Sequence, residues 1–153
     1  MNIETLSQHL LDITKEKYNL LKELHALTSK QAEVISDKQL TGFLSICTQK
    51  QEVIKKINAL DVGFEKQYDL LKTSTNASVF IEVFSKQKAL KELQSTVIQI
   101  TRLIETITDL ELQNKDIYKK VLTDIMVSIN QSAISRSEQI LRYKKMNNYK
   151  KHL

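Results

Sequence analysis

The chain has 153 residues, of which 41% are hydrophobic and 27% are charged, and it contains two Gly, no Pro and one Cys. This length favours one domain, and the scarcity of Gly and Pro leaves too little turn chemistry for a β-sandwich, a β-barrel or a glycine-rich phosphate loop. A single cysteine excludes a disulfide framework and any multi-cysteine metal site. Long helices are therefore the expected structure.

The first expected element in chain order is a long amphipathic helix. Apolar residues recur from Ile3 to Val34 at alternating steps of three and four residues, which is the spacing of one helix face. Lys17 and Gln31 are the only polar residues on that seam. The pattern predicts a helix over residues 2–35.

A second helix follows almost at once. Ser36 and Asp37 offer a cap, because a short side-chain oxygen can accept a hydrogen bond from an unpaired N–H of a first helical turn. The apolar run after this cap extends from Leu40 to Leu71. Since the connection between the two helices is very short, we expect them to be antiparallel neighbours.

The clearest loop is the polar run Thr-Ser-Thr-Asn at residues 73–76. Residues 79–84 then form a compact apolar patch, either a separate turn or two of helix or the start of a third helix. An unbroken stripe from Leu90 to Ile107, which places Ile104 in the core, predicts one long helix over residues 78–132. Glu111 and Asn114 interrupt this stripe, which indicates a shift of the stripe, a bend near residues 112–116 or a contact that fixes the register.

Charge divides the chain into a neutral body and a basic tail. Residues 1–134 contain 17 Lys or Arg and 17 Asp or Glu, whereas residues 135–153 contain six Lys or Arg against Glu138 alone. In the tail, Ile140, Tyr143, Met146 and Tyr149 are spaced by threes, which drifts about 60° per step around a helix. We therefore expect the tail to be disordered or marginally helical.

These elements predict an all-α fold. Residues 1–134 should form an elongated antiparallel three-helix, coiled-coil-like bundle, and residues 135–153 a flexible basic tail. The N-terminal segment MNIETLSQHLLDITKEK lacks the continuous apolar core of a signal peptide, and no stretch reaches the roughly 18 uncharged apolar residues of a membrane span. We expect a cytoplasmic protein without membrane insertion.

The sequence offers little support for an enzyme. The motifs GxSxG, Walker A and GxGxxG are absent from it. His9 and Asp12 have a spacing that suits a metal pair but lack a third ligand, so we interpret His9 as a solvated helix residue. Cys47 lies on the apolar side of the second helix, where a free thiol packs as a small hydrophobe. We expect no catalytic residue, no metal site and no cofactor.

Two stretches of the second helix resemble the FlgN family of flagellar type III export chaperones. They are Asp-Lys-Gln-Leu at residues 37–40 and Thr-Gln-Lys-Gln-Glu-Val-Ile-Lys-Lys-Ile-Asn-Ala-Leu-Asp at residues 48–61. In that family an Asp-x-x-Leu start leads into a Lys-Gln-rich helix that ends in a Leu-Asp pair. The family's third helix is similar to the later run of Leu103, Ile107, Leu110, Asn114, Leu122 and Ile125.

The resemblance implies a cytoplasmic chaperone that binds hook–filament junction (hook-associated) subunits, prevents their premature assembly and delivers them to the flagellar type III export apparatus. Its partners would be hook-associated flagellar proteins and components of that apparatus, and the chain itself would be a monomer or small homo-oligomer. An amphipathic segment can cover the apolar stripe of a client helix. The residues that we expect to bind the partner are Ile134, Ile140, Leu141, Tyr143, Met146 and Tyr149.

Two other classes stay open on the residues alone. Three amphipathic helices also suit a structural coiled-coil protein that self-assembles or tethers its partners. The interleaved Lys, Tyr and Met residues of the tail suit nucleic acid, because aromatic rings stack on bases and Lys neutralises phosphates. Only three of the 23 basic residues are Arg, however, so few side chains could recognise phosphate or base edges with two hydrogen bonds at once.

Overall fold

The structure, a computed structural model, describes residues 2–151, and it describes their side chains except at residues 77, 78, 80, 81 and 147–151. Four helices follow one another in chain order: α1 (Ile3–Ser36), α2 (Leu40–Thr73), α3 (Ala77–Lys86) and α4 (Lys88–Lys151). No strand occurs among the described residues. The all-α fold predicted from the sequence is therefore confirmed.

The chain separates into two compact units, and the division lies within α4. The first unit ends at Asn114 and contains α1, α2, α3 and the first part of α4, whereas the second begins at Lys115 and consists of the rest of α4. Helix α4 runs without a break through residues 112–116 and through the tail to Lys151. The boundary expected from charge, at residues 134/135, and the flexibility expected of the tail stay predictions.

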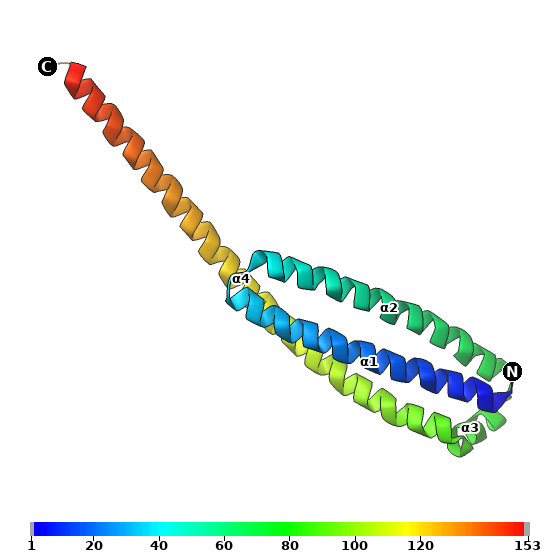
Figure 1. Cartoon of the computed structure of the whole chain (residues 1–153). Helices are drawn as coiled ribbons and strands as arrows, with labels where there is room; N and C mark the ends of the chain where they lie inside the picture. The colour runs from blue at the N-terminus through cyan, green and yellow to red at the C-terminus, as the bar shows by residue number, and fades with distance from the viewer. Residues whose placement is uncertain (1, 152–153) are drawn as a thin grey trace. The chain divides into compact units, whose positions relative to one another are not determined.

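Helix α1 begins at a side-chain cap and ends at a tight turn. Asn2 Oδ1 accepts a hydrogen bond from the Thr5 N–H at 2.8 Å, which satisfies a donor of the first turn. After the helix, Lys38 adopts a φ of 57°, the left-handed conformation that commonly reverses a chain at a helix end. Only residues 37–39 separate α1 from α2, and the two helices lie side by side in opposite directions, as predicted (Figure 1).

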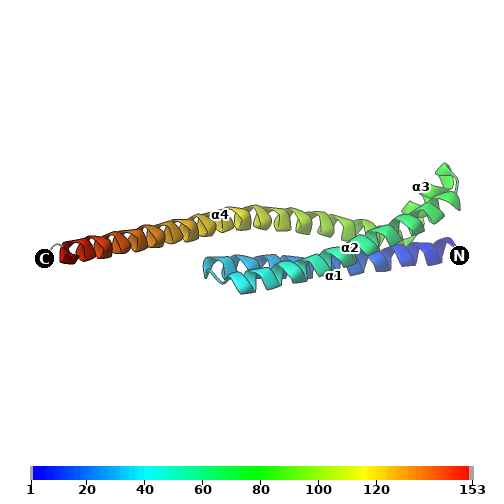
Figure 2. The same cartoon turned by 90° about the horizontal axis from the view of Figure 1, so that it is seen from above.

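A short helix, α3, brings the chain back to the start of α1. Asn76 caps α3 by accepting a hydrogen bond from the Val79 N–H at 2.9 Å, and Gln87, in an extended conformation, separates α3 from α4. Figure 2 shows α3 at the same end of the first unit as the N-terminus of α1. The predicted loop is present at residues 74–76, because Thr73 still belongs to α2. The prediction of one long helix over residues 78–132 is wrong at both ends: residues 79–84 belong to the separate helix α3, and α4 begins at Lys88 and continues to Lys151.

Within the first unit, α4 runs in the same direction as α1. Lys15 Nζ lies 2.8 Å from Glu92 Oε1, and further along Asn114 Nδ2 donates a hydrogen bond to the Thr28 carbonyl oxygen at 2.9 Å. Two aliphatic clusters hold these helices together. The first consists of Leu6, Leu10, Leu11, Leu71, Val83, Leu90 and Leu93, and the second of Leu21, Leu24, Val53, Ile57, Ile100 and Ile107.

The phase of the buried stripe on α4 differs from the prediction. Ile104, which was placed in the core, is 42% exposed, and Val97 is 41% exposed, whereas Thr96 is buried and Leu103 packs against the second cluster. Two stripes with the same 3–4 spacing overlap on this helix, and both pass through Ile100 and Ile107. Thr96 tolerates burial because its hydroxyl donates to the Glu92 carbonyl oxygen of its own helix.

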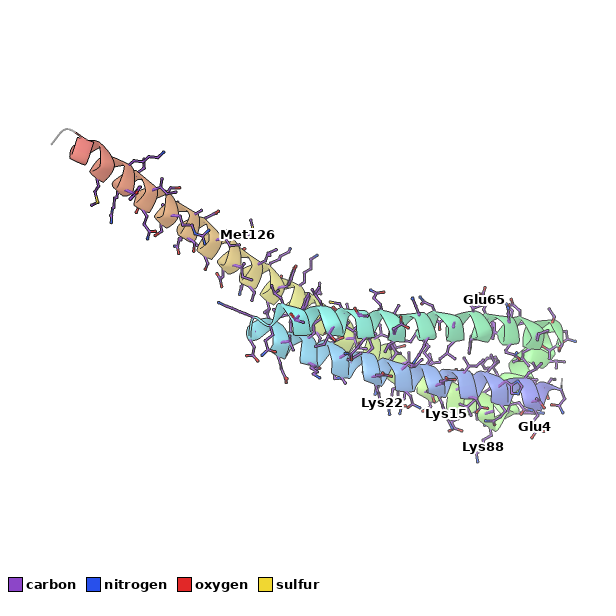
Figure 3. The ribbon with its side chains drawn as sticks, turned by 45° about the horizontal axis from the view of Figure 1, so that its top comes forward. Glu4, Lys15, Lys22, Glu65, Lys88 and Met126 are labelled. Carbon is purple, nitrogen blue, oxygen red and sulfur yellow. The ribbon has the colours of Figure 1, made fainter. Side chains whose placement is uncertain are left out.

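The outward faces of the first unit carry charge. Figure 3 shows Lys15 and Lys22 pointing outward from α1 and Glu65 pointing outward from α2, and all three residues are exposed. Cys47, which was expected in the core, is half-buried, and its sulfur lies 3.2 Å from Gln31 Nε2. This polar contact is the first sign that the core is not aliphatic along its whole length.

Candidate functional site

The second unit is a helical segment whose side chains stay accessible. From Lys115 to Met146 every side chain is exposed except those of Ile117, Val121 and Ile125, which are half-buried. Ten of the exposed side chains are large and apolar or aromatic: Tyr118, Leu122, Met126, Val127, Ile129, Ile134, Ile140, Leu141, Tyr143 and Met146. Such a concentration of exposed apolar surface is typical of a site that another molecule covers.

Five of these residues, together with the half-buried Ile125, form a stripe along one side of the helix. The first stripe begins with Leu122, Ile125, Met126 and Ile129 and continues at Ile140 and Tyr143. Ala133 and Arg136 occupy the intervening positions, so the spacing of three and four residues is kept while the apolar surface is interrupted. The stripe is therefore longer than the tail, since it begins before residue 135.

A second stripe lies on another side of the same helix. It consists of Val127, Ile134 and Leu141, which are spaced by seven residues and so stay nearly in line. At 100° per residue, this second stripe is centred about 140° from the first. A partner helix that covers one stripe would leave the other exposed.

The residues expected from the sequence to bind a partner are thus divided between sides of the helix. Ile140 and Tyr143 lie on the first stripe, whereas Ile134 and Leu141 lie on the second. Met146 lies on neither, about 100° or more from the centre of each stripe, and the side chain of Tyr149 lies outside the described residues.

Four further exposed members of these stripes were not among the expected residues: Leu122, Met126, Val127 and Ile129. Sequence reasoning missed them because it continued the core stripe of the third helix through this region. Their side chains are 42–61% exposed. The signal that could have found them is the four apolar residues among the five at 125–129, which are wider than one coiled-coil seam.

Unpaired positive charge accompanies the apolar stripes. Arg136, Arg142, Lys144 and Lys145 are exposed, and none of them forms an ion pair with another described residue. Glu138 is the only acidic residue of the tail. The segment therefore combines apolar surface with free cations, which suits a partner that is itself amphipathic and acidic.

The first unit offers little else that resembles a reaction site. A cavity of about 170 Å³ is lined by Ile13, Phe64, Val97 and Ile100 among others, and the ion pair between Lys17 and Asp61, 2.7 Å long, forms its polar part. His9 is half-buried, and no group of three or more His, Cys, Asp or Glu side chains is placed to hold a metal ion within the described part of the chain. Among the helices as described, none is long and apolar enough to cross a membrane.

Comparison with known proteins identifies the family. A family model described as FlgN protein matches residues 1–149, which is nearly the whole chain. The searches of curated proteins and of solved structures gave no match. FlgN proteins are chaperones of flagellum biogenesis. Because this match covers nearly the whole chain, the chain belongs to the FlgN family of flagellar export chaperones.

Proposed function

We propose that this protein is a cytoplasmic chaperone for hook–filament junction subunits, which it binds through the second unit, keeps from assembling prematurely and delivers to the type III export apparatus. Family membership supports a flagellar export chaperone in general. The observation that carries the more specific proposal is the exposed apolar surface between Leu122 and Met146.

The physical reason is that the client and the second unit both have apolar helix surfaces that can cover each other. Subunits of this class are expected to have amphipathic helical ends that self-associate once exposed. A helix that offers an apolar stripe can occupy the same surface and so compete with assembly. Each large apolar side chain buried in such a contact contributes about 1.5–3 kcal/mol before the cost of ordering is subtracted.

The two stripes make the proposal specific about residues. The first stripe has the longer run of apolar residues and includes Tyr143, whose side chain is 66% exposed, more than any other large apolar or aromatic side chain described in the segment. We assign the client to the first stripe. The second stripe, with Ile134 and Leu141, serves as the comparison surface on the same helix.

The test is isothermal titration of a purified hook-associated subunit into the full chain and into paired variants. Ile140→Ser/Tyr143→Ser alters the first stripe, and Ile134→Ser/Leu141→Ser alters the second with the same number of substitutions. We expect affinity to fall at least tenfold in the first variant and less than threefold in the second. Equal loss in both would contradict the assignment to one stripe, and no binding by the unaltered chain would contradict the client class.

Salt separates this function from nucleic-acid binding. Apolar burial is nearly indifferent to ionic strength, whereas contacts between Lys and phosphate weaken steeply as salt rises. We expect client affinity at 300 mM salt to stay close to that at 50 mM, including in a variant with Lys144, Lys145, Lys150 and Lys151 changed to Gln. Tighter binding to a random DNA duplex, lost with salt and in the Gln variant, would favour the nucleic-acid alternative.

Light scattering on the free chain addresses the remaining alternative. A chaperone should be a monomer or a small homo-oligomer, so that its apolar stripes stay available to the client. A structural coiled-coil protein should instead form an open series of assemblies that grows with concentration. An open series would contradict the chaperone assignment of the stripes.

A further inference from the structure

Five polar side chains meet inside the first unit, where the aliphatic clusters end. Thr28 and Gln31 come from α1, Lys50 comes from α2, and Glu111 and Asn114 come from α4. We refer to these five residues as the polar cluster. Four of them are buried, with exposed fractions of 0% for Thr28, 5% for Gln31, 8% for Lys50 and 4% for Asn114.

The contacts of the polar cluster join all three helices. Lys50 Nζ donates a hydrogen bond to Gln31 Oε1 at 2.9 Å and forms an ion pair with Glu111. Asn114 Nδ2 donates to the Thr28 carbonyl oxygen at 2.9 Å. These contacts link α1 to α2, α2 to α4 and α4 to α1.

The polar cluster is not the arrangement that maximises stability. Asn114 Oδ1 is buried and has no hydrogen-bond partner among the described residues, and a buried acceptor without a partner is costly. Lys50 is a buried cation, and well-packed apolar residues often replace a buried ion pair without loss of stability. A single polar layer within an apolar seam is best known for fixing one alignment of the helices.

Residues spaced by seven along a helix lie nearly in line and form a column. The columns that contain members of the polar cluster show why apolar packing alone would not fix the alignment of α4. Between residues 90 and 125 of α4, the residues spaced by seven from Glu111 are Leu90, Val97, Ile104, Tyr118 and Ile125, and those spaced by seven from Asn114 are Leu93, Ile100, Ile107 and Val121. Within α2, those spaced by seven from Lys50 are Phe43, Ile57, Phe64 and Leu71. Each column is apolar or aromatic except at its one member of the polar cluster. A slip of α4 by seven residues would therefore mostly exchange apolar side chains for apolar side chains.

We propose that Lys50, Glu111 and Asn114 are positioning residues that fix the axial register of α4 on the α1–α2 hairpin. Only one register brings Glu111 to Lys50 and Asn114 to the Thr28 carbonyl, while any register slipped by seven residues leaves the buried Lys50 cation without its anion. A slip of seven residues moves a helix by about 10 Å along its axis. The polar cluster thereby decides which residues of α4 enter the first unit and which are left on the exposed stripes.

The experiment measures this register directly by pulsed electron paramagnetic resonance between two spin labels. The full chain carries Cys47→Ser to remove its own thiol, and labels are attached at Glu16→Cys in α1 and Glu105→Cys in α4, both exposed positions of the first unit. With the polar cluster intact we expect one distance. In Lys50→Leu/Glu111→Leu/Asn114→Leu we expect helical circular dichroism to persist and a second distance, displaced on the order of 10 Å, to appear.

A matched control removes a different polar pair. Lys17 and Asp61 form an ion pair between α1 and α2 that does not involve α4, so Lys17→Leu/Asp61→Leu should keep the single original distance. If the triple Leu variant also keeps only the original distance, the register is set elsewhere and the proposal is overturned. A displaced distance in the Lys17/Asp61 variant would overturn it as well, because the effect would not be specific to the polar cluster.

A second variant decides the question if the triple Leu variant does not fold. Lys50 is kept, and the polar pair is moved seven residues along α4 by Glu111→Leu, Asn114→Leu, Tyr118→Glu and Val121→Asn. We expect the single distance to move on the order of 10 Å, because the buried Lys50 cation follows its anion. An unmoved distance would overturn the proposal. A residue that only stabilised the fold would change the melting temperature and not this distance.

Discussion

Leucine and isoleucine residues occur along α4 on both sides of Asn114, but the exposed fractions of their side chains differ between the two units. Leu90, Leu93 and Ile100 are at most 7% exposed, whereas Ile129 and Ile140 are 61% and 55% exposed. The difference does not come from the spacing of the residues, since both parts of the helix carry stripes with steps of three and four. It comes from α1 and α2, which cover the first part. An apolar stripe with helical spacing therefore does not by itself tell whether it is buried, and the structure shows where the same chain covers it.

The largest expected effect separates the two units by stability. Leu10 is 1% exposed and belongs to the first aliphatic cluster, so Leu10→Ala should lower the free energy of unfolding by about 2–5 kcal/mol. Ile140→Ala in the second unit should change it by less than about 0.5 kcal/mol, because its side chain is exposed in the free chain. Urea titrations followed by circular dichroism give both values. Similar losses of unfolding free energy in the two variants would contradict the difference in burial between the two units.

A smaller loss of unfolding free energy is expected when the ion pair between Lys50 and Glu111, near the end of the first unit, is removed. In Glu111→Ala the buried Lys50 ammonium keeps Gln31 as its partner but loses its counter-ion, which should cost about 1–3 kcal/mol. Lys55→Ala removes a cation whose ion pair with Glu52 is exposed, and it should cost less than about 1 kcal/mol. Thermal melts of the two variants compare a buried with an exposed ion pair, and equal melting temperatures would show that burial of Lys50 has no energetic weight.

The two glycines of α2 give a comparison within one helix. A Cβ at Gly63 would lie 3.9 Å from Ile13 Cδ1, an ordinary contact, so Gly63→Ala should stabilise the chain by about 0.5–1 kcal/mol through its higher helix propensity. A Cβ at Gly42 would lie 3.0 Å from Val34 Cγ1, which is tight and should offset most of that gain in Gly42→Ala. A larger rise in melting temperature for Gly42→Ala would contradict the packing of α1 against α2.

The smallest expected effect on stability is that of removing the tail. A chain that ends at Ala133 lacks only exposed positions among those whose side chains are described, so its unfolding midpoint should stay within the error of the full chain. Client capture should nevertheless fall, because Ile140 and Tyr143 are removed from the first stripe. Differential scanning calorimetry together with titration of the client tests both statements. A lower midpoint would show that the tail contributes to the fold.

The helices of the first unit could be predicted well from local chemistry. The bounds of α1 and α2 and the short connection between them each depend on a few neighbouring residues, and the structure has them within about two residues of where they were expected. The cap expected at Ser36 and Asp37 is not formed, because α2 begins after Gln39, whose side chain makes no capping hydrogen bond. The phase of α4 could not be predicted in the same way. Val97 and Ile104 have the right residue type and spacing for a core, and their exposure depends on where α1 and α2 lie, which a single helix does not encode.

The candidate site was predicted only in part for a related reason. Ile140 and Tyr143 were found because the basic tail drew attention to them, and both are exposed on the first stripe. Leu122, Met126 and Ile129 were missed because their spacing equals that of core residues further up the same helix. Glu111 and Asn114 were recognised as interruptions of the stripe. Their polar partners come from residues 28, 31 and 50, which lie too far away in sequence for a periodicity argument to reach.

The parallel pairing of α1 with α4 has a consequence for how the chain folds during synthesis. Helices α1 and α2 are joined by three residues, whereas Thr28 and Asn114 form a hydrogen bond across 86 positions of the chain. Contacts that close short loops form earlier than contacts that close long ones, so the α1–α2 hairpin should be assembled while α4 is still being made. The growing chain then carries an uncovered hairpin for as long as it takes to translate residues 74–114. The part of α4 beyond Asn114 is therefore synthesised only after the α1–α2 hairpin, which packs against the first part of α4, has been made.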